Sequence, residues 1–379
     1  MTIGIDARFF GPRGKGLGRY TQKLIESLEQ VDQQNDYIIF LRRENFEEFQ
    51  PKNPRFKKVL ADFRWYSVAE QILFPFAIYK QKINLMHFPH FNVPIFYLKS
   101  YVVTIHDLIL RHFSTHRAST LNMVRYWFKN TAYKIVFWLA IRRAKKIITV
   151  SEYVKEDIIK SFNVAPQKVA VTYEGAPELN LQKGGFKRIL NEFGIRAPYL
   201  LYVGNAYPHK NLERLIKAFK ILINDFKKDL QLVLVGEEDY FYERLQGEAR
   251  DFVSNGEVFE RLVFTDFVSD DELWILYQNA ALYVFPSLCE GFGLPPLEAM
   301  AHGLPVVCSN ATCLPEILGQ ATVYFDALNP QDMAEKINQV LGDKSLSRTL
   351  VKEGFEQIKK YSWQKMAQET LQIYKNSLF

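Results

Sequence analysis

A chain of 379 residues, 48% of them hydrophobic, is long enough for two cores, since domains commonly hold about 100–200 residues. The net charge of +6 is modest and no long run of one sign occurs, which disfavours a dedicated nucleic-acid binder. The N-terminus lacks a secretory leader and no stretch approaches the ~18 apolar residues of a spanning helix, so we expect a cytoplasmic protein that is not integral to a membrane.

Short β-branched or apolar runs alternate with longer amphipathic runs along the chain, which is typical of βαβ units and parallel sheets. The first half contains six strand candidates, most of them separated by helices: Ile3–Ala7, Tyr37–Leu41, Leu85–His87, Tyr101–Ile105, Lys146–Val150 and Val169–Thr172. From Glu174 to Pro198 the pattern lapses into Gly, Pro, Asn, Gln and Lys, with Gly184 and Gly185 inside it. We interpret this stretch as an interdomain linker.

A second series of six strand candidates follows the linker: Tyr199–Gly204, Gln231–Gly236, Leu262–Thr265, Leu282–Pro286, Pro305–Ser309 and Ala321–Phe325. Its helices carry clear start signals. Ser269 and Glu272 have the spacing of a capping box, and Asn329 precedes a proline at the first helical position. The sequence therefore predicts an α/β protein with two sheets.

Three cysteines, Cys289, Cys308 and Cys313, cannot all pair with one another, and none has the Cys-x-x-Cys spacing of a metal site. We expect reduced thiols in the core.

Ligands bind beyond the carboxyl ends of the strands in open parallel sheets, so the loops that follow strands are the candidates for chemistry. One such loop contains Gly14, Gly16 and Gly18 and opens a helix. Glycines let backbone N–H groups approach a phosphate or sugar hydroxyl, and a helix N-terminus favours negative charge. The spacing differs from the Rossmann dinucleotide fingerprint, and a plain flexible turn is the alternative.

A second loop runs from Gly204 through Asn205 to Asn211, between a strand and a helix. Lys210 would lie one residue before that helix, where its ammonium and the free N–H groups could converge on one diphosphate. A solvated lysine in a turn is the alternative.

The third loop follows Leu282–Pro286 and is bracketed by two carboxylates, Glu290 and Glu298. Gly291 and Gly293 lie between them and leave backbone donors accessible at a helix start. Sugar hydroxyls need acceptors and phosphates need donors, so one segment offers both. A surface acid is the alternative for Glu290, and a solvated helix face is the alternative for Glu298.

The segment EGFGLPPLEAMAHGLPVV, in which seven residues separate Glu290 from Glu298, resembles the donor-site signature of the retaining GT-B glycosyltransferases of the large group-one family. Three other segments resemble that family in the same order: YVGNAYPHKNLERLIKAF, FTDFVSDDELWILYQNA and LPEILGQATVYFD. The likeness covers nearly the whole chain and is stronger in the second half.

The resemblance implies two Rossmann-like, doubly wound lobes that face a central cleft. Residues 1–180 would form the acceptor-side domain and residues 181–361 the nucleotide-sugar donor domain. A last helix, residues 362–379, would cross back to the N-terminal domain.

The resemblance also implies roles for the second half of the chain. Glu298 would accept hydrogen bonds from the ribose, Glu290 would face the donor sugar, and Lys210 would neutralise the departing diphosphate. The rest of the donor site would comprise Gly204, Asn205, Val268, Gly291, Phe292, Gly293 and Leu294. Many members have an arginine where this chain has Asn205, which leaves the second cationic contact open.

In the first half, His106 resembles a family histidine near the reacting sugar. It could donate a hydrogen bond to a sugar hydroxyl or polarise the acceptor, although a lone histidine is more often structural. The loop with Gly14, Gly16 and Gly18 would contact the acceptor or the diphosphate.

The implied activity is transfer of a hexose, with mannose as the first choice, to a glycan or lipid-linked acceptor in cell-surface polysaccharide synthesis. Anomeric configuration would be retained without a metal or other cofactor, and the co-substrate would be GDP-mannose or a UDP-sugar. A sugar-nucleotide epimerase and a catalytically silent nucleotide-sugar-binding subunit remain as alternatives on the same fold. A nicotinamide dehydrogenase would also share the sheets, but the dinucleotide fingerprint is missing.

A helical stretch between Arg117 and Lys146 mixes aromatic and basic residues: Tyr126, Trp127, Phe128, Tyr133, Phe137 and Trp138 with Arg125, Lys129, Lys134, Arg142, Arg143, Lys145 and Lys146. Such a helix suits an anionic bilayer surface, so peripheral contact with the inner face of the cell membrane is a further hypothesis. A core helix with a solvated basic edge is the alternative.

Overall fold

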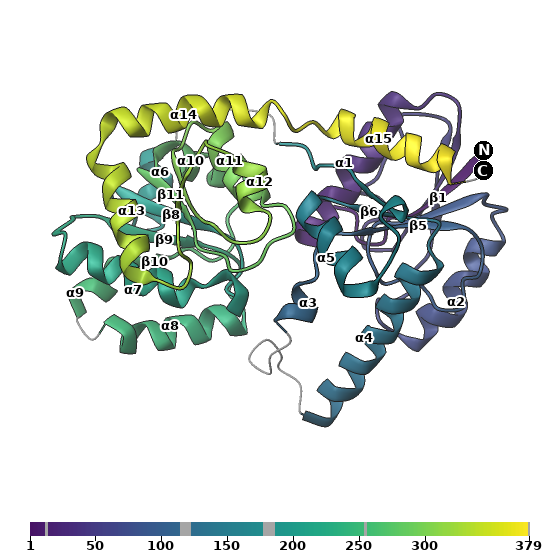
Figure 1. Cartoon of the computed structure of the whole chain (residues 1–379), viewed down its shortest axis with the longest axis horizontal. Coiled ribbons are helices and arrows are strands. Elements are labelled where there is room, and N and C mark those ends of the chain that lie inside the picture. The colour runs from purple at the N-terminus through teal and green to yellow at the C-terminus, as the bar shows by residue number, and fades with distance from the viewer. Residues whose placement is uncertain (12–13, 114–122, 177–185, 254–255, 378–379) are drawn as a thin grey trace. The chain divides into compact units, whose positions relative to one another are not determined.

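The computed structural model describes residues 1–11, 14–113, 123–176, 186–253 and 256–377, which form two compact units (Figure 1). The first unit consists of Met1–Leu108, Ser119–Gly175 and Tyr361–Phe379, and the second of Ile109–Ala118 and Ala176–Lys360. The glycine pair of the expected linker, Gly184 and Gly185, lies outside the described residues.

The first unit is built on a seven-stranded parallel sheet in the order β3-β2-β1-β4-β5-β6-β7. Its strands are β1 (Thr2–Asp6), β2 (Asp36–Leu41), β3 (Phe56–Leu60), β4 (Leu85–Phe88), β5 (Tyr101–Ile105), β6 (Lys146–Thr149) and β7 (Val169–Val171). Its helices are α1 (Lys15–Val31), α2 (Val68–Tyr79), α4 (Met123–Arg143), α5 (Glu152–Phe162), the short 3₁₀ helix η3 (Pro166–Lys168) and α15 (Trp363–Asn376).

The second unit is built on a six-stranded parallel sheet in the order β10-β9-β8-β11-β12-β13. Its strands are β8 (Tyr199–Val203), β9 (Gln231–Val235), β10 (Leu262–Phe264), β11 (Leu282–Phe285), β12 (Val306–Ser309) and β13 (Val323–Phe325). Its helices are α3 (Ile109–His112), α6 (Phe186–Glu192), η4 (Pro208–Lys210), α7 (Leu212–Asn224), α8 (Tyr240–Val253), α9 (Gly256–Phe259), α10 (Asp270–Asn279), α11 (Leu294–Ala301), α12 (Leu314–Leu318), α13 (Pro330–Gly342) and α14 (Lys344–Ile358).

The two parallel sheets confirm the predicted α/β class, and every predicted strand is present with ends that shift by at most two residues. The prediction missed β3, whose sequence FKKVL has two lysines in its middle and no clean alternation. Because β3 lies at the edge of the sheet, next to β2, it tolerates charged side chains that an inner strand would not.

The predicted helix caps are present. Ser269 and Glu272 form a complete capping box at the start of α10, and the Asn329 side chain accepts hydrogen bonds from Gln331 and Asp332 at the start of α13. These caps satisfy backbone N–H groups that a helix start otherwise leaves unpaired. The three cysteines are buried and reduced, as expected.

Each sheet reverses its strand order once. In the first sheet this happens between β1 and β4, and in the second between β8 and β11. At such a point the two connecting loops leave in opposite directions and open a crevice beyond the carboxyl ends of the strands. The fold therefore places the loop that follows β8 next to the loop that follows β11.

One face of the first sheet is covered by α2, α4 and α5. A single cluster of buried side chains joins these helices to the strands and includes Phe74, Ile141 and Ile158. The helix α15 packs along α1, as Figure 1 shows. None of the helices in the described ranges is both long and apolar enough to cross a bilayer.

A buried chain of hydrogen bonds ties α15 to the first sheet. The hydroxyl of Tyr374 lies 2.6 Å from His87 Nδ1, and His87 Nε2 lies 2.8 Å from Thr104 Oγ1. Burial, with a smaller contribution from the nearby charge of His106, lowers the pKa of His87 to about 3. The neutral imidazole that results offers one donor and one acceptor, which matches its two hydroxyl partners.

Removing the Tyr374 hydroxyl tests whether this chain of hydrogen bonds stabilises the first unit. We expect Tyr374→Phe to lower the free energy of unfolding by about 1–3 kcal/mol, because His87 Nδ1 would be left buried without its partner. The change is measured by chemical unfolding of the full chain. Tyr240→Phe, at a ring that is 52% exposed, is the control and should stay within about 0.5 kcal/mol of the wild type. An equal loss in both variants would contradict the assignment.

Candidate active site

The loops after β8 and β11 are hydrogen-bonded to each other at the point where the strand order of the second sheet reverses. The His209 carbonyl accepts hydrogen bonds from Leu288 N (2.8 Å) and Ser287 Oγ (3.2 Å). The Asn211 side-chain amide donates to the carbonyl of Pro286 at 3.0 Å. These bonds fix the two loops relative to one another before any ligand binds.

Lys210 and Glu290 form an ion pair across these two loops. Lys210 Nζ lies 2.5 Å from Glu290 Oε1, and the side chains are only 14% and 11% exposed. Asn211 adopts a left-handed conformation between η4 and α7, so Lys210 precedes α7 by two residues rather than the expected one. A largely buried ammonium needs a negative partner, and Glu290 supplies it within the unit.

The turn into α11 depends on Gly293. Its φ of 103° and ψ of 56° lie in a region that side chains rarely adopt, and an added Cβ would lie 2.9 Å from Leu314 Cδ2. Within the described part of the chain, no side chain caps the start of α11, whose first residue is Leu294. Pro295 and Pro296 follow Leu294 and have no N–H, so the backbone donors at this helix start are the amides of Gly293 and Leu294. These two amides suit an anionic ligand next to Glu290.

Two residues that the sequence reasoning missed shape this same loop. The Glu290 amide donates to Thr312 Oγ1 at 3.1 Å. The thiol of Cys313 lies 3.3 Å from the carbonyl oxygens of both Glu290 and Phe292. Thr312 and Cys313 follow β12, so the rule that ligands bind beyond the carboxyl ends of strands would have pointed to them.

Glu298 points inward from α11. The residue is 9% exposed, and the hydroxyl of Tyr277 lies 3.2 Å from Glu298 Oε2. The alternative of a solvated helix face is therefore wrong. A buried carboxylate with an oriented oxygen is a suitable acceptor for ligand hydroxyls.

The remaining predicted donor positions lie along the same edge of the sheet. Tyr242 donates its hydroxyl proton to the Gly204 carbonyl at 2.7 Å, and Tyr202 does the same to the Asn205 carbonyl at 2.9 Å. Val268 is buried beyond β10, which lies two strands from β8. The structure thus brings Lys210 together with Glu290, whereas Val268 lies further along the edge.

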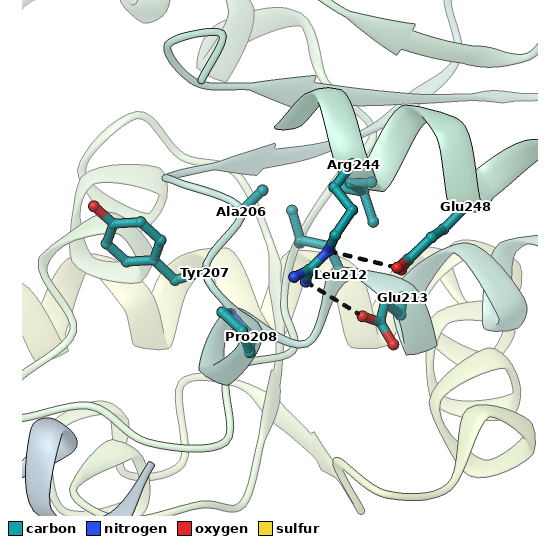
Figure 2. Close-up of a pocket in the computed structure, with 8 residues that line it drawn as sticks. Ala206, Tyr207, Pro208, Leu212, Glu213, Arg244 and Glu248 are labelled. Atoms are coloured by element: carbon teal, nitrogen blue, oxygen red, sulfur yellow. Dashed lines mark ion pairs between the residues drawn. The ribbon is translucent and has the colours of Figure 1, made fainter. Parts of the chain in front are cut away.

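A small pocket lies beside the Gly204–Asn211 loop, lined by Ala206, Tyr207, Pro208, Leu212, Glu213, Arg244, Leu245 and Glu248 (Figure 2). Figure 2 shows Arg244 directed toward two acids, with contacts of 3.9 Å to Glu213 and 3.5 Å to Glu248. Two carboxylates balance this one guanidinium. Arg244 is therefore a poor replacement for the arginine that many family members have at Asn205.

In the loop that contains Gly14, Gly16 and Gly18, local packing explains why two of the three residues are glycine. A Cβ on Gly14 would overlap the carbonyl oxygen of Phe9, and one on Gly18 would overlap that of Gly11. Gly16 faces open space. Gly14 and Gly18 thus let the start of α1 pack against its own loop, and contact with an acceptor or diphosphate stays a prediction.

His106 follows β5 in the first unit, and both of its ring nitrogens have partners. Nε2 lies 2.9 Å from the Pro89 carbonyl, which can only accept, and Nδ1 lies 3.3 Å from Glu174 Oε1. Burial alone would lower the pKa of His106, but the hydrogen bond and charge of Glu174 outweigh it and the pKa is raised. A bond from His106 to a sugar hydroxyl would require one of these partners to be exchanged, and that role stays a prediction.

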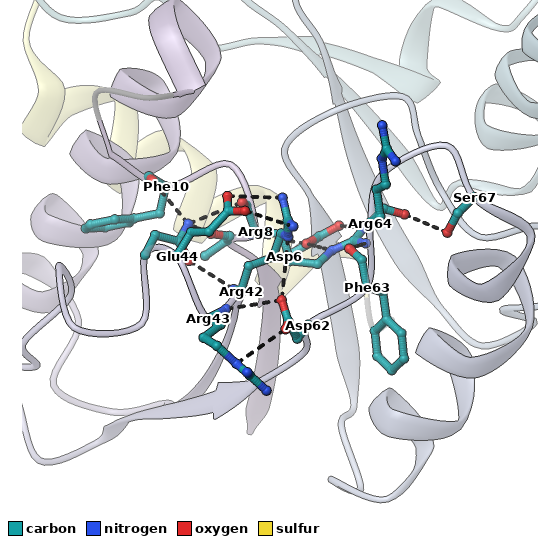
Figure 3. Close-up of polar contacts among 12 residues, drawn as sticks. Asp6, Arg8, Phe10, Arg42, Arg43, Glu44, Asp62, Phe63, Arg64 and Ser67 are labelled. Atoms are coloured by element: carbon teal, nitrogen blue, oxygen red, sulfur yellow. Dashed lines mark hydrogen bonds and ion pairs between the residues drawn. The ribbon is translucent and has the colours of Figure 1, made fainter.

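A buried ionic cluster lies at the switch point of the first sheet, and the sequence reasoning did not find it. Arg8 Nη2 lies 2.7 Å from Asp6 Oδ2 and 2.6 Å from Glu70 Oε1. Figure 3 shows Arg8 turned toward Asp6, with a separate group on neighbouring loops in which Arg42 and Arg43 contact Asp62. The cluster joins the end of β1 to the first turn of α2 and is satisfied internally, which indicates a structural role.

Two family models match the chain, one in each half. The model described as glycosyl transferases group 1 matches residues 187–357, which contain Lys210, Glu290 and Glu298. The model described as glycosyltransferase family 4 matches residues 14–177. The chain belongs to the group-one glycosyltransferases.

The similarity of this glycosyltransferase to known proteins extends over most of its length. O-antigen chain mannosyltransferase B from Escherichia coli is 27% identical over 381 residues, which cover 95% of this chain and 96% of that protein. An O-antigen chain mannosyltransferase from Salmonella typhimurium is 26% identical over 85% of each chain. Sucrose-phosphate synthase from Thermosynechococcus elongatus superposes with a TM-score of 0.77 at 20% identity, over 99% of this chain and 98% of that one. The expected GT-B fold is confirmed.

The charge state of His106 predicts a pH dependence of stability. Because its pKa is raised in the folded glycosyltransferase, its stabilising effect is complete below the ordinary histidine pKa of about 6.5 and is lost as the pH rises through the raised value. We expect the difference in free energy of unfolding between the wild type and His106→Gln to be larger at pH 6 than at pH 9. Glu174→Gln should remove most of this pH dependence. A difference that grows with pH would contradict the assignment.

Proposed function

We propose that this group-one glycosyltransferase transfers a mannosyl residue from a nucleotide-diphosphate mannose to a glycan or lipid-linked acceptor during synthesis of a cell-surface polysaccharide. The observation that carries the proposal is the Lys210–Glu290 pair beside the uncapped start of α11. Similarity over 95% and 85% of the chain to two O-antigen chain mannosyltransferases supports mannose and a polysaccharide product. GDP-mannose is the first donor to test, and a UDP-sugar is the second.

The donor diphosphate would bind between Lys210 and the first turn of α11. In the free enzyme Glu290 balances the ammonium, and the phosphate would take over that charge when it binds. Glu290 would then be released toward the hydroxyls of the donor sugar. Negative charge develops on the leaving diphosphate as the glycosidic bond breaks, so donors already fixed there stabilise the transition state more than the ground state.

Glu298 would accept hydrogen bonds from the ribose of the nucleotide. Tyr277 holds one of its oxygens from the side of α10, which fixes the orientation of the carboxylate. Burial of this site limits competition from water for the same hydrogen bonds.

We further propose that transfer retains the anomeric configuration and needs no metal. The family signature around Glu290 and Glu298 supports retention, with the acceptor attacking from the face that the diphosphate leaves. Lys210, with the amides of Gly293 and Leu294 at the start of α11, would supply the positive charge that a metal ion provides in other transferases.

Peripheral contact with the cell membrane belongs to the same proposal, because a lipid-linked acceptor is held at a bilayer. It concerns where the enzyme works and is separable from the chemistry of the donor site.

The stereochemical outcome tests the proposed reaction directly. With GDP-α-mannose and a mannose-containing acceptor, we expect an α-linked product, identified from its one-bond C1–H1 coupling by NMR. A β-linked product would contradict retention. Conversion of the donor without any acceptor would favour an epimerase, and donor binding without transfer to any acceptor would favour a silent subunit.

Lys210→Ala is expected to lower turnover by about 100–1,000-fold, since removal of one fixed donor to a developing oxyanion has that effect. Glu298→Ala is expected mainly to raise the donor KM, because the ribose does not react. Initial rates at varied donor concentration separate the two effects. Lys352→Ala, at an exposed lysine on α14, is the control and should behave as the wild type. Unchanged turnover in a folded Lys210→Ala protein would rule out the phosphate assignment.

A further inference from the structure

The helix α2 is apolar on both of its faces. Phe74 and Ile78 point into the core of the first unit. The opposite face carries Val68, Ile72, Leu73 and Phe76, all exposed, with Val68 at 75% and Phe76 at 60%. A surface helix normally places polar side chains opposite its core face, and a helix that is apolar all round is usually covered on both sides. The second face of α2 is therefore suited to contact with an apolar medium.

The loop after β4 extends this apolar face. The hydroxyl of Tyr79, at the end of α2, donates to the Phe96 carbonyl at 3.2 Å and accepts from the Leu98 amide at 2.9 Å. These bonds hold the loop against α2, while the side chains of Phe96 and Leu98 remain exposed. Exposed apolar side chains on a firmly held loop are not explained by packing within the unit.

The C-terminal half of α4 borders the same surface. Arg143 Nη1 donates to the Ile95 carbonyl at 2.7 Å, which joins α4 to the loop. Ile135 and Trp138 are exposed on α4, whereas Phe137 is buried in the core. The described half of α4 thus has one side in the core and an exposed side that is aromatic and basic, and its contact with a bilayer stays a prediction. Residues 117–122 and the side chains of residues 123–130 lie outside the described part of the chain.

Exposed cationic side chains lie at the end of α2, in the loop after β4 and on α4. Lys80 continues the exposed face of α2, Lys99 lies with its ammonium 5.4 Å from the Tyr79 ring, and Arg142 lies 5.8 Å from the Trp138 ring. Lys134 and Arg143 are also exposed. The apolar residues of this surface therefore have cationic neighbours on the adjoining elements.

Acidic side chains are absent from this surface as far as the structure describes it. The exposed residues of α2 and the described exposed residues in the C-terminal half of α4 include no Asp or Glu. The one acid within α2, Glu70, is fully buried and pairs with Arg8 at 2.6 Å. No exposed carboxylate on these two helices would therefore repel an anionic partner.

We propose that this surface docks on an anionic phospholipid bilayer. The apolar face is Val68, Ile72, Leu73, Phe76, Phe96 and Leu98, and it would enter the boundary between headgroups and acyl chains. The surrounding lysines and arginines would reach the lipid phosphates, since long cationic side chains extend along an apolar surface and keep their charge in the headgroup layer. The charge pattern favours a bilayer over a protein partner, because an anionic membrane complements every part of this surface at once.

The inference goes beyond the proposed transfer reaction and names the element that would bring the enzyme to a lipid-linked acceptor. Only the biological purpose of the docking rests on the proposed function, whereas binding of the surface to a bilayer does not. Vesicle binding is measured with neither donor nor acceptor present, so failure of the docking surface and failure of the proposed reaction are distinguishable.

The test is co-sedimentation of the full chain with vesicles of phosphatidylcholine that contain about 30% phosphatidylglycerol. Binding is measured at about 0.02 M salt, where electrostatic attraction is strong, and at about 0.5 M salt, where it is weak. We expect the protein to bind the anionic vesicles more weakly at high salt, and not to bind vesicles of pure phosphatidylcholine. The double variant Leu73→Glu/Phe76→Glu should bind at least about tenfold more weakly, because it places two charges in the apolar face. Leu328→Glu, at a 63% exposed leucine of the second unit, is the matched control and should bind as the wild type.

Donor hydrolysis and transfer to a soluble acceptor should be the same in both variants as in the wild type, which shows that the α2 variant is folded. Absence of wild-type binding to anionic vesicles at low salt would overturn the proposal. Equal loss of binding in the two variants, or none in either, would also overturn it. Concentration-dependent self-association without lipid that Leu73→Glu/Phe76→Glu abolishes would instead assign this face to a second copy of the chain.

Discussion

The strand order of the second sheet is the constraint on which the candidate site depends. Because the order reverses between β8 and β11, residues about eighty positions apart along the chain meet at one edge. Backbone bonds from Leu288 to His209 and a side-chain bond from Asn211 to Pro286 then hold the two loops in register. The Lys210–Glu290 ion pair is a consequence of this topology. It places a largely buried cation beside an internal anion, and the proposed phosphate would take the place of that anion.

In the first unit, two neighbouring histidines have pKa values shifted in opposite directions by their surroundings. Hydroxyl groups bond to both nitrogens of His87, which stays neutral because burial disfavours its charge, whereas the carboxylate of Glu174 favours the charged form of His106. The positive charge on His106 in turn lowers the pKa of His87 further. The polar interior of this unit is therefore built from pairs that satisfy one another, as are Arg8 and its two acids.

Much of this fold could be predicted from the sequence because parallel strands are short, apolar and regularly spaced. Local signals also sufficed for the capping box of α10 and for the loop and helix start that contain Glu290 and Glu298, because the spacing of these two residues is a property of one segment. Contacts between distant segments could not be predicted. The Glu174 partner of His106 is 68 residues away, and the Tyr374 partner of His87 is 287 residues away. The apolar outer face of α2 was missed for another reason: a run of apolar residues does not tell which of two faces is buried.

The central claim is that the carboxyl edge of the second sheet binds a nucleoside diphosphate through Lys210 and the start of α11. A thermal-shift titration tests it most directly, with GDP, UDP, their monophosphates and their sugar conjugates added to the wild type and to Lys210→Ala. The account predicts that one diphosphate class stabilises the wild type more than the matching monophosphate and that most of this gain is lost in the variant. Stabilisation of Lys210→Ala as large as that of the wild type, or stabilisation of neither by any nucleotide, would contradict it.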